Sequence, residues 1–158
     1  MNEFTIRPMR PEDAEEVSAM IGSVLMEVNI KDYTVEALKE FVDFYNPDEV
    51  RHIPERGGHS YVAELGGEII GCASICPYEN EGESIIEAFY VRADMEGKGV
   101  GRRLLETLEA DEMFLNTKRT VVSSSITAHE FYHKFGYNYV GGVPVLEEED
   151  HYWVEKKR

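Results

Sequence analysis

Several residue types are scarce in this chain of 158 residues, and each scarcity excludes a class of protein. Only two cysteines occur, Cys72 and Cys76, both in the strand-like run EIIGCASICPY. The Cα atoms of two residues four positions apart in a strand lie about 13 Å from each other, whereas a disulfide needs its two Cα atoms within about 7 Å. We therefore expect two free thiols, which excludes a disulfide-stabilised extracellular domain.

Long apolar runs are also missing. No stretch approaches the roughly 20 apolar residues that a membrane-spanning helix needs. Residues 1–10, MNEFTIRPMR, lack the apolar centre of a signal peptide. We expect a cytoplasmic protein that does not interact with membranes. Hydrophobic residues still make up 42% of the chain, which suffices for the core of a single domain spanning residues 1–158.

Positive charge is scarce, with 16 Lys and Arg against 31 Asp and Glu, a net charge of -15. This balance disfavours nucleic acid as a partner. An acidic surface attracts cationic substrates, but it also serves solubility alone. Charge by itself therefore does not define the function.

The spacing of apolar residues predicts an α/β sheet with hairpins. Residues 46–59, rich in Pro and Gly, are expected to form a loop. Asp111 and Glu112 fall within the apolar stripe of the third helix, unless that helix bends or ends there. Strands are expected at 3–9, 60–65, 68–78, 84–91, 119–126, 137–145 and 151–157, and helices at 11–28, 34–45, from about 101, and at 127–135.

The segment DMEGKGVGRRLLETLE, residues 94–109, has glycines at alternate positions between a strand and a helix. Glycine allows close approach of the backbone to a ligand, and the first N–H groups of a helix lack partners within it. Lys98, Arg102 and Arg103 add positive charge to an otherwise acidic chain. The segment therefore predicts an anion site, such as one for a phosphate.

Two other phosphate-binding motifs do not fit. The P-loop pattern G-x-x-x-x-G-K-S/T does not occur, and the Rossmann pattern G-x-G-x-x-G fails because position 102 is arginine. A glycine turn that only begins a helix remains the alternative.

The same segment resembles the pyrophosphate-binding signature Q/R-x-x-G-x-G/A of the GNAT superfamily of N-acetyltransferases. Gly99 and Gly101 take the glycine positions, and Glu96 stands where Gln or Arg is usual. IRPMRPEDAEEV, FYVRADMEGKGVG and SITAHEFYHKFGY also resemble passages of that family, in the same order. Ser125 stands where Asn is common. The resemblance covers nearly the whole chain.

The resemblance implies a mixed, mostly antiparallel seven-stranded sheet flanked by about four helices, with splayed fourth and fifth strands. The pantetheine arm of acetyl-CoA would lie between those strands. The acetyl group would pass directly to a primary amine of a small molecule, or to a peptide N-terminus or lysine. The coenzyme-binding residues that it implies are Phe89, Tyr90, Val91, Glu96, Gly97, Lys98, Gly99, Val100, Gly101, Arg102, Ser125 and Tyr132.

Direct transfer needs a base for the ammonium and an acid for the departing thiolate. Strand alternation places Glu87 on the face of Ile85, Phe89 and Val91, where burial would raise its pKa. A strand-edge glutamate facing water is the alternative, with Glu83 and Glu81 as substitutes.

Tyr132 falls at the family's general-acid position, according to the same resemblance. It also lies on the apolar stripe of its short helix, so a purely structural tyrosine of the core is the alternative.

Two alternative functions stay open. HEFYH, residues 129–133, matches the zinc-hydrolase motif H-E-x-x-H, with His129 and His133 on one helix face and Glu130 between them. Its helix is short and the histidines lie beside the apolar stripe, so we expect no metal. A non-catalytic acyl-CoA sensor is the other alternative.

The acceptor site is expected in residues 26–45 and in the loop 46–59. The aromatic residues that could line it are Tyr33, Phe41, Phe44 and Tyr45. The sequence does not fix the oligomeric state, and a homodimer through the terminal strands is one arrangement that it allows.

Overall fold

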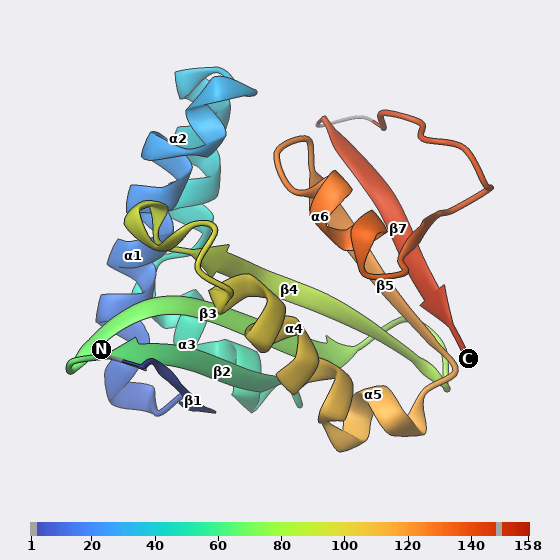
Figure 1. Ribbon diagram of the computed structural model, residues 1–158, viewed down its shortest axis with the longest axis horizontal. Helices are drawn as coiled ribbons and strands as arrows, with labels where there is room; N and C mark the ends of the chain where they lie inside the picture. Colours follow the sequence, from blue (N-terminus) through green and yellow to red (C-terminus); the bar gives the residue numbers. More distant parts are fainter. Residues whose placement is uncertain (1–2, 148–149) are drawn as a thin grey trace.

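The sheet runs in the order β1-β2-β3-β4-β5-β7-β6 in the computed structural model, which describes residues 3–147 and 150–158 (Figure 1). Neighbouring strands are antiparallel except β4 and β5, which are parallel. This confirms the mixed, mostly antiparallel seven-stranded sheet. The strands are β1 (Thr5–Pro8), β2 (His59–Leu65), β3 (Glu68–Pro77), β4 (Glu83–Val91), β5 (Arg119–Ser125), β6 (Asn138–Tyr139) and β7 (His151–Lys157).

Helices cover both faces of the sheet and enclose two cores. The first three pack on one face, and α4 and α5 on the other, with α6 beside β7 (Figure 1). The structure has six α-helices among the described residues, two more than the sequence led us to expect. They are α1 (Ala14–Glu27), α2 (Val35–Phe44), α3 (Pro47–Glu55), α4 (Val100–Ala110), α5 (Glu112–Asn116) and α6 (His129–Lys134).

The sequence signals for the first two helices are confirmed. The apolar stripe of α1, from Ala14 to Leu25, is buried against the sheet. Thr34 caps α2, because its hydroxyl accepts a hydrogen bond from the N–H of Ala37 at 3.2 Å. Among the described residues, no helix has the length and apolarity to cross a membrane. Both cysteines are free thiols, as expected.

The loop prediction for residues 46–59 is wrong, because α3 occupies most of that segment. Asn46 caps the helix by accepting a hydrogen bond from the N–H of Glu49 at 3.0 Å, and Pro47 fills its first turn. Proline suits that position because its missing N–H would have no partner there. Val50 and Ile53, three residues apart, are both buried.

The apolar stripe is interrupted at Asp111 because α4 ends there and α5 begins. Its buried carboxylate accepts hydrogen bonds from the N–H of Met113 at 2.8 Å and from the Tyr61 hydroxyl, and it contacts Nδ1 of His59 at 2.8 Å. It therefore caps α5 and ties it to β2. Glu112 is exposed to solvent.

The fourth and fifth strands are splayed, as expected. β4 pairs with β5 only from Glu83–Arg119 to Ile86–Val122, and the remaining residues of the two strands diverge. Ala88 has φ of 51°, and the register of β4 against β3 shifts beside it, which marks a β-bulge. The divergence leaves the edge of β4 beyond Ile86 without a neighbouring strand.

The bulge overturns one expectation about Glu87. Ile86, Phe89 and Val91 pack into the core under α4, whereas Tyr90 packs into the core under α1. Glu87 follows Ile86 and therefore faces the α1–α3 side, opposite to Phe89 and Val91. Strand alternation fails here because the bulge adds one residue between Glu87 and Tyr90.

We expect Asp111→Ala to lower the free energy of unfolding by about 2–4 kcal/mol, because it leaves buried donors unpaired and uncaps α5. Urea denaturation measures this, with Glu112→Ala as the exposed control. A difference between the two variants below about 0.5 kcal/mol, within the range of ordinary surface substitutions, would contradict this role.

The loss of unfolding free energy in Asp111→Ala should depend on pH. Burial alone would raise the pKa of Asp111, but the hydrogen bonds from Tyr61, Met113 and His59 lower it below the ordinary value. Its stabilising effect is therefore fully present above the unfolded pKa of about 3.9 and is lost as the pH falls through the folded pKa. The gap between wild type and Asp111→Ala should close in acid.

Candidate active site

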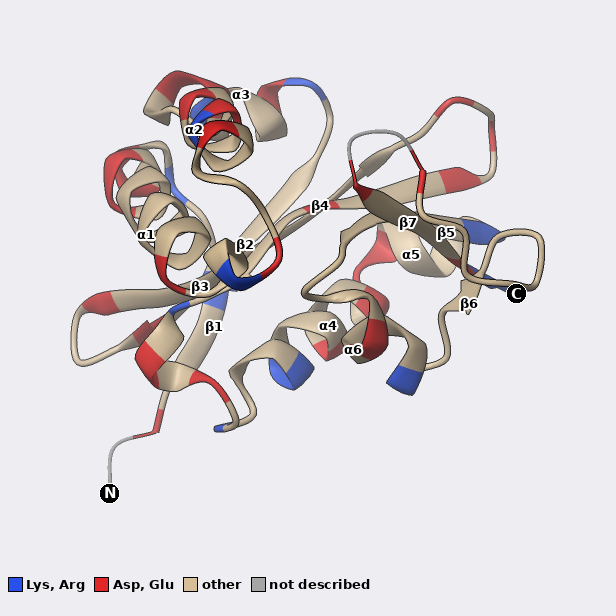
Figure 2. Ribbon diagram, turned by 90° about the horizontal axis from the view of Figure 1, so that it is seen from above, with Lys and Arg blue, Asp and Glu red and all other residues tan. Residues whose placement is uncertain are grey.

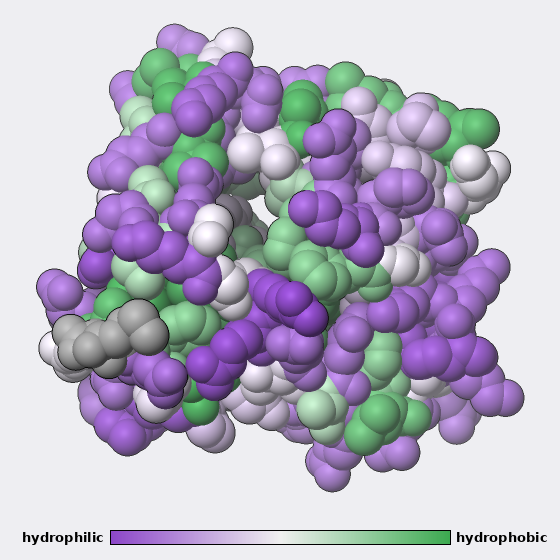
Figure 3. Space-filling model, in the orientation of Figure 1, coloured by the Kyte–Doolittle hydropathy of each residue, from purple (hydrophilic) through white to green (hydrophobic). Residues whose placement is uncertain are grey.

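Two cavities meet where β4 and β5 diverge. One, of about 440 Å³, contains Glu87 and is called the glutamate cavity. The other, of about 430 Å³, contains Gly97, Gly99 and Gly101 and is called the glycine cavity. Both volumes are typical of small-molecule sites. The strands β1–β4 with α1–α3 form one half of the molecule, and β5–β7 with α6 form the other (Figure 1). The surface is hollowed between these two halves (Figure 3). The linings share Asn29, Phe89, Tyr90, Ser125, Ala128 and Tyr132.

The glycine cavity lies at the N-terminus of α4. Gly97 and Gly99 have φ of 75° and 86°, a conformation that side chains disfavour. Gly101 is constrained by space, since a Cβ there would lie 3.3 Å from the ring of Phe131. Gly99 occupies the N-cap position and provides no side-chain cap. The first N–H groups of α4 and the positive end of its dipole are thus available to an anion.

Two cationic side chains, Arg102 and Lys134, line the glycine cavity. Figure 2 shows basic residues at the start of α4 and at the end of α6. Arg103 turns elsewhere, with its guanidinium donating to the carbonyl of Phe4 at 3.2 Å and lying over that ring. Lys98 is exposed and does not line the cavity. Every other residue proposed for coenzyme binding does.

The edge of β4 forms a wall of the glycine cavity through Phe89, Tyr90 and Val91. Their edge toward β5 has no strand partner, since pairing between the two strands ends at Ile86. Backbone groups on such an edge can hydrogen-bond an extended ligand.

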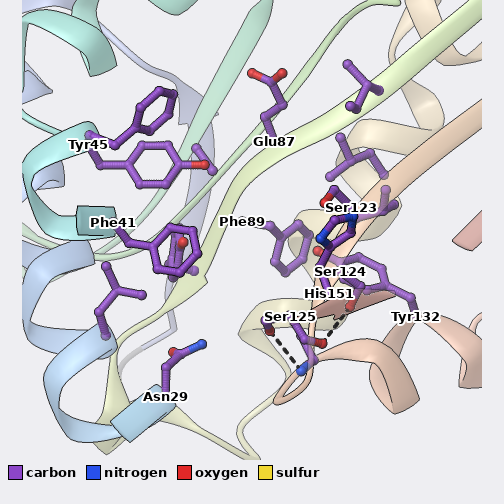
Figure 4. A pocket seen from close by; sticks show the side chains of 18 of the residues that line it. Asn29, Phe41, Tyr45, Glu87, Phe89, Ser123, Ser124, Ser125, Tyr132 and His151 are labelled. Atoms are coloured by element: carbon purple, nitrogen blue, oxygen red, sulfur yellow. Dashed lines mark hydrogen bonds between the residues drawn. The ribbon is translucent and has the colours of Figure 1, made fainter. Parts of the chain in front are cut away.

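Glu87 lines the glutamate cavity and is half-buried (Figure 4). Burial raises its pKa, and the charge of Arg56 and a contact with the Cys76 thiol, 3.8 Å away, offset this only in part. The expected direction of the pKa shift is therefore confirmed. The carboxylate can accept a proton nearer to neutral pH than an ordinary glutamate can.

The two substitute carboxylates do not line either cavity. Glu83 pairs with Arg119 at 2.7 Å, and hydrogen bonds from Arg119 and Asn80 lower its pKa. Glu81 lies exposed in the turn before β4. Among the three candidates for the base, only Glu87 reaches the cavity.

Tyr132 lies at the junction of the two cavities and is buried. Its ring packs edge-on against Phe89, with centroids 5.7 Å apart. Burial raises its pKa well above the ordinary value, so the hydroxyl stays protonated. Within residues 3–147 and 150–158, that hydroxyl has no hydrogen-bond partner in the protein. Tyr132 thus packs in the core and also presents a free proton donor to the junction.

The segment before α2 forms hydrogen bonds with the loop after β5 and with the residue that precedes β7. The Tyr33 hydroxyl accepts from the N–H of Ile126 at 2.8 Å and donates to the carbonyl of Asp150 at 2.7 Å. Thr127 donates to the carboxylate of Asp32 at 2.7 Å. These bonds join the two halves of the molecule beside the cavities. Tyr33, Phe41, Phe44 and Tyr45 all line the glutamate cavity, as the sequence suggested.

Sequence reasoning missed several residues of the site. Asn29 is buried and lines both cavities, and although it lies within residues 26–45, where the acceptor site was expected, it was not singled out. His151 and Trp153 of β7 line the glutamate cavity and lie outside the expected range. None of these carries a motif, because tertiary folding brings each to the site. Lys134 was part of a matched motif, FYHKFGY, and that signal could have assigned it to the glycine cavity.

His129 and His133 have packing roles outside both cavities. Nδ1 of His129 lies 2.7 Å from the Tyr139 hydroxyl, and Nδ1 of His133 lies 3.2 Å from the carbonyl of Tyr137. Their rings stack on Tyr152 and Tyr139. The part of the chain that the structure describes contains no cluster of three or more metal-ligating side chains. The H-E-x-x-H spacing here supports ring packing on β6 and β7.

Comparisons with known proteins agree on one family. A family model described as an acetyltransferase (GNAT) domain matches residues 56–139. The amino-acid acetyltransferase of Ralstonia nicotianae (strain ATCC BAA-1114 / GMI1000) is 35% identical over 85 residues. That match covers 54% of this chain and 19% of the relative. The chain therefore spans only a small part of that relative's length.

Solved structures share the fold over nearly the whole chain. The PaiA N-acetyltransferase of Thermoplasma acidophilum, in complex with coenzyme A, has a TM-score of 0.82 at 15% identity, with 99% of each chain covered. An aminoglycoside 6'-N-acetyltransferase complexed with coenzyme A has a TM-score of 0.71 at 16% identity, with 97% of this chain and 96% of that chain covered. At these identities the similarity concerns the fold alone.

We expect Glu96→Gln to strengthen coenzyme A binding about twofold to fivefold, which is the effect of one charge at a helix terminus. Glu96 lines the glycine cavity, where its negative charge opposes an anion at the N-terminus of α4. Isothermal titration calorimetry measures the dissociation constant, with Glu36→Gln on α2 as the charge-matched control. Equal affinities in the two variants would place the diphosphate elsewhere.

Proposed function

Because this chain belongs to the GNAT acetyltransferase family, we propose that it transfers an acetyl group from acetyl-CoA directly to a primary amine. The observation that carries the proposal is the junction of the two cavities at Tyr132 and Phe89. One cavity has the features of a diphosphate site and the other contains a carboxylate with a raised pKa. A reaction between a coenzyme and an amine needs both, joined where the acetyl group would lie.

The glycine cavity would hold the coenzyme. The N–H groups that begin α4, together with Arg102 and Lys134, would bind its phosphates. The pantetheine arm would then extend along the free edge of β4 at Phe89, Tyr90 and Val91. This placement would bring the thioester to the junction, because the edge of β4 runs from one cavity to the other.

Glu87 would act as the general base. The acceptor enters as an ammonium ion and must lose a proton before its nitrogen can attack the thioester carbon. Glu87 would take that proton directly or through a water molecule. The N–C bond then forms, the nitrogen loses its second proton to solvent, and the C–S bond breaks as the carbonyl is restored.

Tyr132 would act as the general acid. The departing thiolate needs a proton, and the Tyr132 hydroxyl is protonated and has no hydrogen-bond partner in the part of the chain that the structure describes. Donation to sulfur completes the balance, since the proton taken up by Glu87 returns to solvent and solvent reprotonates the tyrosine. A coenzyme sensor without catalysis would need only the glycine cavity, so the joined glutamate cavity favours the enzyme.

We expect Tyr132→Phe to lower kcat at least about tenfold at saturating acetyl-CoA, the smaller end of the effect of a lost general acid. Thiol release measures the rate. Tyr137→Phe is the control, because it removes a buried hydroxyl that bonds Glu109 at 2.8 Å, outside both cavities. An unchanged kcat in Tyr132→Phe, with chemistry rate-limiting, would exclude this acid.

We expect Glu87→Gln to lower kcat/KM about 100-fold, as for loss of a general base. In wild type, kcat/KM should fall as the pH drops through the pKa of Glu87, which lies above the ordinary glutamate value. The variant should lack that acidic limb. Glu81→Gln, an exposed carboxylate outside both cavities, should keep it. A variant at Glu87 with wild-type rate and profile would rule out this base.

A further inference from the structure

The linings of the two cavities carry opposite charges. Arg102 and Lys134 line the glycine cavity, whereas among the described residues the glutamate cavity has no lysine or arginine in its lining and Glu87 is the only carboxylate there. Arg56 is the cation that acts on the charge of Glu87, but it lies outside the lining and pairs with Glu49 at 2.6 Å. A ligand carboxylate in the glutamate cavity would thus meet Glu87 and find no counter-ion.

The walls of the glutamate cavity are largely aromatic. Phe41 of α2 and Tyr45 at the end of that helix face the cavity from one side, and Phe89 lies across from them on β4 (Figure 4). Trp153 of β7 contributes from the other half of the molecule. Aromatic side chains prefer edge-to-face or offset contacts with another ring, and they also attract an ammonium group. Such walls suit an acceptor that carries a ring.

His151 adds one polar group to the apolar walls. Its Nε2 atom is buried and has no hydrogen-bond partner within residues 3–147 and 150–158, a rare state for a buried polar atom. Its ring lies edge-on to Trp153, with centroids 5.5 Å apart, and lines the cavity opposite Phe41 and Tyr45 (Figure 4). A rotation of the imidazole would bring this atom to the cavity surface, where a hydroxyl group on a bound ring could supply the missing partner.

We propose that the acceptor is a primary amine on a short chain that bears a hydroxylated aromatic ring and no carboxylate. Glu87 would receive the ammonium, the aromatic walls the ring, and Nε2 of His151 the ring hydroxyl. This class differs from a free amino acid, whose carboxylate the cavity does not neutralise. The inference rests on the proposed function, since it assumes that the glutamate cavity holds the acceptor.

Tyramine and tyrosine test the class, because they differ only in the carboxylate. With acetyl-CoA and thiol detection, we expect kcat/KM for tyramine to exceed that for tyrosine at least about tenfold, the effect of an unpaired charge. Tyrosine amide, which has an uncharged group in place of the carboxylate, should behave more like tyramine. Tyramine should also exceed propylamine about tenfold. Tyrosine equal to or better than tyramine, or propylamine equal to it, would overturn the proposal.

Two variants test the assigned walls. Phe41→Leu should lower the ratio of kcat/KM for tyramine to that for propylamine several-fold, while Phe114→Leu, a buried ring outside both cavities, should leave this ratio unchanged. His151→Leu should abolish the preference for tyramine over phenethylamine. A preserved preference in His151→Leu would contradict the role of its Nε2 atom.

Failure of the proposed function can be distinguished from failure of the proposed acceptor class. If no amine releases thiol, the protein is not the enzyme proposed above. Calorimetric binding of tyramine and of tyrosine to the complex with coenzyme A then still decides the acceptor class. Tighter binding of tyramine supports it, and equal or tighter binding of tyrosine overturns it.

Discussion

The parallel pairing of β4 and β5 ends after Ile86 and Val122, and the site depends on this interruption of the sheet. Backbone N–H and C=O groups beyond that point have no neighbouring strand, and a buried edge of this kind needs partners. The N-terminus of α4 opens onto the same gap and adds a second set of N–H groups without partners. A ligand that combines an extended amide-bearing arm with a diphosphate would satisfy both sets.

The bulge at Ala88 places Glu87 and Phe89 on opposite faces of β4. Because one extra residue enters the strand there, Glu87 turns toward α3 while Phe89 turns toward α4 and α6. A regular strand would have placed both on the same face. The bulge thereby directs a carboxylate with a raised pKa away from the glycine loop before α4. Tyr132, on the short helix after β5, reaches the junction between them.

The elements with strong local signals could be predicted from the sequence. The apolar stripe of α1, the Thr34 cap and the glycine spacing before α4 each determine local structure within a few residues. The prediction for α3 failed because prolines and glycines suggested a loop, although Pro47 lies where a helix accepts proline. The face of Glu87 was wrong because no local signal announces the bulge at Ala88.

Residues that reach the site through tertiary folding could not be predicted. His151 and Trp153 lie far in the sequence from residues 26–45 and line the glutamate cavity with them only because β4 and β5 diverge. The single domain, the cytoplasmic location and the homodimer stay predictions from the sequence. The family itself could be recognised because Gly99, Gly101 and Tyr132 fall at fixed spacings along the chain.

We propose that the amides at the start of α4 bind a coenzyme's diphosphate and so direct its arm along β4. Titration of isotope-labelled protein with coenzyme A, followed by amide NMR, tests it most directly. We expect saturable chemical-shift changes at the amides of Gly97, Gly99 and Gly101 and of residues 89–91, with little change along β1. Binding of coenzyme A that leaves the glycine amides unshifted, or no binding at millimolar concentration, would contradict it.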